Sequence, residues 1–209
     1  MNGKTAGRLR ARRAVWSCAR LWGDTQASQI VEFAFTIPLL VVFVVGIFDF
    51  GSAFAVKQKL ANAVREGARI AASQPSSDLS NTPLSGGCGA PASICAVRDA
   101  VDFYLTAGKV NDCGLSSANS PSQTALAWTF TTTGSCAGTL TLVINRGVTY
   151  AVALTTPYTS NLTVEASSVQ MSYPYKWQFN TVITLLVPGA TYAASTQLTT
   201  TSVMQNLNN

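Results

Sequence analysis

Two carboxylates stand in a stretch of sequence that is otherwise apolar. Glu32 is followed directly by an unbroken apolar run, and Asp49 closes that run. A charge at the centre of a bilayer costs about 2.5–3.5 kcal/mol and less near an end, so such acids usually have a partner. We expect lipid headgroups and water to solvate Asp49. Glu32 has no cation within one helical turn, so its expected chemistry is a charge pair with a group outside its own helix.

The apolar run that contains these acids is long enough to cross a membrane. Its 21 residues, 30–50, would extend about 31 Å as an α-helix, which matches a hydrocarbon thickness of about 30 Å. A cleaved secretory signal is the alternative, but the run is long for a signal core and no small-x-small cleavage site follows it cleanly. Pro38 removes one backbone hydrogen bond and predicts a kink in the span.

The same helix is expected to continue beyond the span as an amphipathic segment. Apolar residues recur there at spacings of four and three, on one stripe: Val56, Leu60, Val64, Ala68 and Ala71. The pattern predicts one helix over 28–73, half in the membrane and half outside it. Gly67 costs about 1 kcal/mol relative to alanine inside a helix, which predicts a close approach of another backbone; simple tolerance of glycine is the alternative.

The positive charge of the chain is concentrated at its N-terminus. The formal net charge is +5, and six of the 14 basic residues precede the first acid: Lys4, Arg8, Arg10, Arg12, Arg13 and Arg20. The positive-inside rule accounts for this cluster, because it retains the N-terminus in the cytoplasm. Nucleic-acid binding is the alternative. No aromatic residue lies among the basic residues from Lys4 to Arg13, and we expect no nucleic-acid partner.

Four of the five cysteines follow the span, and the fifth, Cys18, lies in the leader. An even number of thiols in a Gly/Ser-rich domain favours two disulfides formed in an oxidising compartment, with three pairings open. Sequence proximity favours Cys88 with Cys95 and Cys113 with Cys136. A four-cysteine zinc site is the alternative, but the chain has no CxxC pair and no histidine. We therefore expect neither a metal nor another cofactor.

Residues 74–209 are expected to form an exported α+β domain. A helical face runs over 94–107, and strand-like alternation covers 125–133, 139–145, 148–155, 162–173 and 197–204. This predicts a small helix packed on an antiparallel sheet of four or five strands. Segment 177–187 is too short to cross a membrane and could be a strand, a buried helix or a segment at the headgroups. Trp177 beside Lys176 favours the headgroups.

The domain offers little for catalysis. Without histidine, a serine or cysteine triad would need an unusual base. Asp99 and Asp102 are three residues apart and are interpreted as the solvated side of a helix. The sequence therefore predicts that the protein is not an enzyme.

The combination of motifs resembles a known family. A basic leader, a glutamate followed by an aromatic residue, and a proline resemble type IV prepilin-like proteins. Segments 31–40 (VEFAFTIPLL) and 62–69 (NAVREGAR) are similar to the TadE-like pseudopilins of the tight-adherence (Flp pilus) secretion system. Segment 169–175 (VQMSYPY) resembles the strand ending in Tyr-Pro-aromatic near their C-terminus.

This resemblance implies a role for Glu32. In prepilin-like proteins a membrane aspartyl peptidase removes the leader, and the glutamate becomes the fifth residue of the processed chain. The cut would fall between Ala27 and Ser28 here, although the family usually has glycine where this chain has Ala27. The Glu32 carboxylate would then neutralise an exposed α-ammonium, commonly that of a neighbouring subunit. The resemblance also implies helix packing at Phe33, Gly46 and Gly67.

The resulting prediction has three parts: a cytoplasmic leader 1–27, a helix 28–73, and an exported domain 74–209. The implied function is that of a minor pseudopilin, a structural or assembly component of a tight-adherence pilus. Its implied partners are other pilins and pseudopilins, the prepilin peptidase, the inner-membrane assembly platform and lipid. It would be single-pass in the inner membrane, with its domain periplasmic or in an extracellular pilus. A permanently anchored periplasmic binding or sensing module is the alternative.

Overall fold

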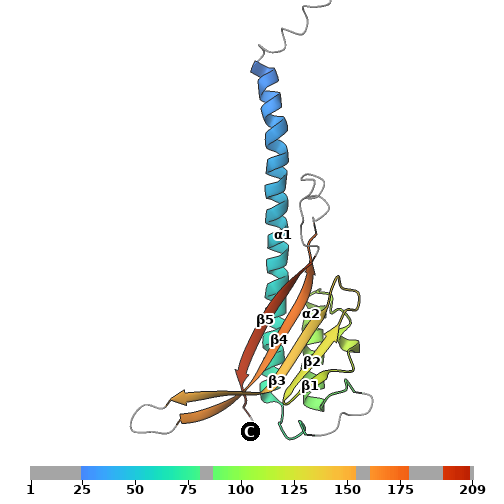
Figure 1. The fold of residues 1–209 in the computed structure, drawn as a ribbon, viewed down its shortest axis with the longest axis vertical. Helices are drawn as coiled ribbons and strands as arrows, with labels where there is room; N and C mark the ends of the chain where they lie inside the picture. The colour runs from blue at the N-terminus through green and yellow to red at the C-terminus, as the bar shows by residue number, and fades with distance from the viewer. Residues whose placement is uncertain (1–24, 81–86, 154–160, 179–194, 208–209) are drawn as a thin grey trace, which may run out of the picture. The chain divides into compact units, whose positions relative to one another are not determined.

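The computed structural model describes residues 25–80, 87–153, 161–178 and 195–207 (Figure 1). Most of the predicted leader 1–27 therefore lies outside the described residues. The chain divides into two compact units, Met1–Ile47 and Phe48–Asn209. The first unit contains the N-terminal half of helix α1, and the second contains the rest of α1 with the helices and strands that follow it.

Helix α1 runs without interruption over Thr25–Ser73, in agreement with the predicted helix over 28–73. Every described side chain from Ser28 to Leu40 is exposed. The C-terminal half instead buries one stripe of small and branched side chains, Ala53, Leu60, Ala63, Val64, Ala68 and Ala71. The helix ends just before Pro75, whose ring disfavours a helical conformation in the preceding residue.

Helix α2 spans Ala92–Ala107 and is followed by a short 3₁₀ turn, η1, at Leu115–Ser117. It begins directly after Pro91, whose fixed φ is compatible with a helix start, and Gly108 follows its last residue. Four fully buried residues at spacings of three and four form its inner face: Ile94, Val97, Val101 and Leu105. They belong to the same core as the buried stripe of α1.

Five strands form one antiparallel sheet in the order β1-β2-β3-β4-β5. They are β1 (Ser122–Thr124), β2 (Ala127–Thr132), β3 (Leu140–Ala153), β4 (Asn161–Lys176) and β5 (Ser195–Gln205). Alternate residues on the central strands are fully buried against the helices: Trp128, Phe130, Leu142, Ile144, Val169 and Met171. The predicted α+β class, with a long helix, a small helix and an antiparallel sheet, is confirmed (Figure 1).

Two features of the sheet differ from the prediction. The pattern predicts separate strands over 139–145 and 148–155, but β3 is continuous over Leu140–Ala153, with a β-bulge between Asn145 and Val148. The Asn145 side chain accepts a hydrogen bond from the Gly147 amide at 2.9 Å, which closes the bulge locally. Strand β1 was not predicted, because its three residues are too few for a pattern.

Both disulfides are present. Cys88 is bonded to Cys95 with 5.6 Å between their Cα atoms, and Cys113 is bonded to Cys136 with 5.3 Å between theirs. This is the pairing that sequence proximity favours. Within the described part of the chain, no group of three or more histidine, cysteine or acidic side chains could hold a metal ion.

Candidate functional site

Glu32 lies near the N-terminus of α1 and is exposed. Its neighbours are exposed large apolar side chains, among them Phe33 at 66% and Phe35 at 78% of their full surface. Among the described residues, its carboxylate makes neither an ion pair nor a hydrogen bond; only its backbone carbonyl accepts a bond, from the Thr36 hydroxyl at 2.7 Å. A carboxylate surrounded by apolar surface gains most from a compact cation on another molecule.

The other predicted positions of the N-terminal half lie along the same exposed helix. Ala27 and Ser28, which flank the predicted cleavage point, are helical. Pro38 lies inside α1, which continues through it, so the kink stays a prediction. A Cβ built on Gly46 would meet no atom within 4 Å. The surface of α1 at Gly46 is therefore open to a neighbouring molecule.

Gly67 is buried where α1 packs against α2 of the same chain. A Cβ built on it would lie 2.5 Å from Cγ2 of Val101, and 3.7 and 3.8 Å from methyl carbons of Val169 and Val97. The contact atoms thus belong to side chains of α2 and β4. Glycine at this position allows the two helices to approach closely.

Gly67→Ala is expected to lower the free energy of unfolding by about 1–3 kcal/mol, because the added methyl overpacks the contact with Val101. Urea unfolding of the full chain in detergent micelles measures this change. Gly51→Ala is the matched control, since a Cβ at Gly51 meets no atom within 4 Å and alanine has the higher helix propensity. Equal effects of the two substitutions would contradict the packing assigned to Gly67.

The expected solvation of Asp49 is wrong. Its side chain is only 1% exposed, and its Oδ1 accepts a hydrogen bond from the backbone amide of Gln178 at 3.1 Å. These two residues are 129 positions apart in the chain, so no local pattern reveals the contact. Asp49 therefore connects the segment that follows β4 to α1, at the end of the apolar run.

The interpretation of Asp99 and Asp102 as the solvated side of a helix agrees with Asp99 but only in part with Asp102. Asp99 is exposed and pairs with Arg98 at 2.6 Å, but Asp102 is half-buried and one of its oxygens has no hydrogen-bond partner in the described part of the molecule. Burial raises the pKa of Asp102 to about 6, and a hydrogen bond with Asp112 and the negative charges of Asp112 and Asp99 act in the same direction.

Asp102→Asn is therefore expected to stabilise the domain at neutral pH. A carboxyl whose pKa is raised by folding destabilises the folded state as pH rises from about 4 to about 6, and the full penalty persists above that range. Because the group is only half-buried, we expect a gain of about 1 kcal/mol at pH 7.5 and none below pH 4. Thermal unfolding at both pH values tests this, with exposed Glu165→Gln as the control. A gain that is the same at both pH values would contradict it.

Arg146 is a buried cation that the sequence pattern did not reveal. It follows Asn145 at the bulge in β3 and is 4% exposed, and its Nη2 donates to the backbone carbonyl of Gln74 at 2.9 Å. Burial lowers its pKa, which the charge of Asp78 partly offsets. The Asn-Arg-Gly sequence is typical of an exposed turn. The β-bulge instead places the Arg146 side chain in the interior of the domain. Its contact with Gln74 connects the sheet to the end of α1.

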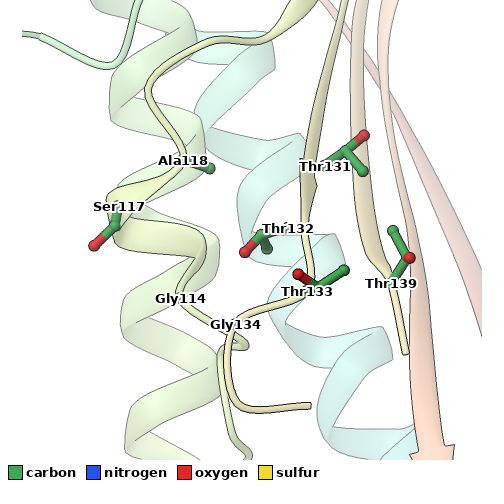
Figure 2. Close-up of a pocket in the computed structure, with 8 residues that line it drawn as sticks. All are labelled: Gly114, Ser117, Ala118, Thr131, Thr132, Thr133, Gly134 and Thr139. Atoms are coloured by element: carbon green, nitrogen blue, oxygen red, sulfur yellow. The ribbon is translucent and has the colours of Figure 1, made fainter. Parts of the chain in front are cut away.

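The domain also contains an open hollow of about 480 Å³ (Figure 2). One wall carries Ser117 and Ala118, and the other carries Thr131, Thr132 and Thr133. The Thr132 hydroxyl is already engaged, donating to the Cys113 carbonyl at 2.7 Å. The lining residues are glycine, alanine, serine and threonine, and none of them has an ionisable side chain. The hollow therefore provides no acid, base or activated nucleophile.

The fold and these positions define a class of chain: one N-terminal helix that is long and apolar enough to cross a membrane, followed by a small disulfide-bonded α+β domain. Residues 27–69 match the family model described as TadE-like protein. Comparisons with curated proteins and with solved structures gave no match. The match and the apolar helix indicate a Tad pilus-related, membrane-anchored protein.

Proposed function

We propose that this protein is a minor pseudopilin of a tight-adherence pilus and has a structural, non-catalytic role. Its N-terminal helix anchors it in the inner membrane, with the leader in the cytoplasm and the domain on the other side. The observation that carries the proposal is the exposed carboxylate of Glu32, which has no partner among the described residues and lies on an apolar helix within the region of the family match. A pilin-like assembly brings such helices together and supplies the missing cation.

In this proposal the prepilin peptidase cuts between Ala27 and Ser28. The cut creates an α-ammonium on Ser28, and Glu32 becomes the fifth residue of the processed chain. The α-ammonium is the compact cation that the carboxylate requires. Pairing the carboxylate with the ammonium of a neighbouring subunit removes both charges from hydrocarbon at once. The pair would therefore fix the register between neighbouring helices.

Lateral packing is proposed to involve the exposed face of the helix. Phe33 provides an exposed aromatic ring close to Glu32, and Gly46 provides an open position where another backbone can approach. Small residues at helix contacts in membranes allow such close packing. The α+β domain then remains available to other pilins and to the assembly platform.

Photo-crosslinking from position 33 tests this function. A photoreactive phenylalanine analogue replaces Phe33 in cells that carry the complete pilus system, and crosslinked partners are identified by mass spectrometry. We expect crosslinks to other pilin or pseudopilin subunits, and their loss in cells without the assembly platform. Crosslinks to lipid alone in both strains would contradict the proposal and favour a permanently anchored periplasmic module.

A further inference from the structure

Aromatic and lysine side chains gather at one end of the Phe48–Asn209 unit. This collar consists of Phe50, Phe54, Lys57, Lys109, Lys176 and Trp177. Phe50, Phe54 and Lys57 follow one another at spacings of four and three, so they share one face of α1. Phe50 and Phe54 are 65% and 63% exposed, which is unusual for large aromatic side chains on a domain surrounded by water.

The chain itself sets the depth of the collar relative to a membrane. Phe50 is the last residue of the apolar run, so a bilayer that contains the run has its polar surface at this residue. At about 1.5 Å per residue, Phe54 lies about 6 Å further along the helix and Lys57 about 10 Å. The headgroup layer of one leaflet is about 5–8 Å thick. The two rings therefore fall within that layer, and the Lys57 side chain can reach back to it.

Trp177 lies at the same depth as Phe50. Their rings meet edge to face with 5.4 Å between centroids, and the adjacent Gln178 amide is bonded to Asp49. The indole N–H donates to the Thr196 hydroxyl at 2.8 Å, so its polar edge is held by the domain. Tryptophan at this depth is typical of the interfaces of membrane proteins.

The collar is also positively charged. Lys109 and Lys176 line one hollow of about 280 Å³, and Val56 of α1 lines it too. No carboxylate is among the residues described as lining this hollow. Two acids adjoin the lining residues: Asp49 accepts the hydrogen bond of the Gln178 amide, and Asp112, which follows Asn111, interacts with Asp102. Neither lysine forms a salt bridge with another described residue, so both are available to an anion at the depth of the headgroups.

We infer that the collar binds the surface of an anionic bilayer, with Phe50, Phe54 and Trp177 among the headgroups and Lys57, Lys109 and Lys176 facing lipid phosphates. This inference rests on the membrane insertion of α1, which is part of the proposed function. The collar holds the domain of an unassembled subunit against the membrane. Near an anionic surface, each lysine is expected to shift the ratio of bound to released domain about fivefold.

Tryptophan quenching by brominated lipids tests the inference on the full chain in vesicles. Vesicles of phosphatidylcholine alone are compared with vesicles that also contain phosphatidylglycerol, each with bromine close to the headgroups or deep in the acyl chains. The fluorescence of Trp177 is obtained by subtracting the signal of the Trp177→Phe variant from that of the wild type. The subtraction cancels the signals of the other three tryptophans. We expect Trp177 to be quenched by shallow bromine, more strongly in anionic vesicles.

The triple variant Lys57→Gln/Lys109→Gln/Lys176→Gln is expected to lose the difference between the two lipid compositions. Lys59→Gln is the control, because Lys59 lies on the same helix outside the collar and its Cδ lies beside Gly108, at the end of α2. Flotation of the vesicles separates the two proposals. Protein that does not float contradicts the proposed insertion itself. If the protein floats but shallow bromine does not quench Trp177, the collar is overturned and the insertion stands. The same holds if the quenching of Trp177 depends on protein concentration and not on lipid charge.

Discussion

Glu32→Gln is expected to reduce incorporation of the protein into pili more than about a hundredfold, because breaking one buried charge pair costs about 3–5 kcal/mol. The amide keeps the size of the side chain but leaves the partner's ammonium uncompensated in hydrocarbon. Membrane insertion should be unaffected, since the apolar run is unchanged. Quantitative immunoblotting of sheared pili and of membranes measures both quantities.

Glu66→Gln is the matched control for this substitution. Glu66 lies on the same helix, and its carboxylate pairs with Arg69 at 2.7 Å on the surface. Exposed pairs of this kind contribute only about 0–1 kcal/mol, so piliation should stay near normal. Normal incorporation of the Glu32→Gln protein, or an equal loss in both variants, would contradict the charge-pair mechanism.

Removing the disulfide between Cys113 and Cys136 is expected to give the largest loss of stability. The bond closes a sequence separation of 23 residues, for which chain entropy predicts about 3 kcal/mol, against about 2 kcal/mol for the separation of seven between Cys88 and Cys95. The double variant Cys113→Ala/Cys136→Ala should therefore unfold at a urea midpoint about 1–2 M lower than the wild type.

Two controls define this result. The double variant Cys88→Ala/Cys95→Ala should show the smaller decrease, and Cys18→Ser in the leader should show none. Cys113 is fully buried beside the hydrogen bond from Thr132 to its carbonyl, so the loss extends to local packing as well. A reversed order of the two double variants would show that loop length does not determine the stabilisation here.

Local patterns predicted the elements of this fold well. The spacing of Leu60, Val64 and Ala68 predicts the buried stripe of α1, and the alternation of Trp128 and Phe130 predicts the buried face of β2. In both cases the period of the pattern is the period of the backbone itself. The disulfide pairing was also accessible, because neighbouring cysteines close the shortest loops.

The features that the sequence pattern does not reveal depend on how the folded chain packs. Asp49 is buried and accepts a hydrogen bond from the Gln178 amide, and the pKa of Asp102 is raised first by burial and then by Asp112 beside it. Arg146 is buried because a bulge replaces an expected turn. Each of these properties is set by tertiary contacts, for which a single sequence has no periodic signal. Glu32 could be proposed from the sequence because the anomaly is local: an acid followed directly by an apolar run.

N-terminal mass spectrometry of the protein from cells with and without the prepilin peptidase tests the central claim most directly. The Glu32 pair requires a new α-ammonium, and only removal of residues 1–27 places one at Ser28. The account predicts a chain that begins at Ser28 when the peptidase is present and a full-length chain when it is absent. A full-length chain in both strains would contradict it.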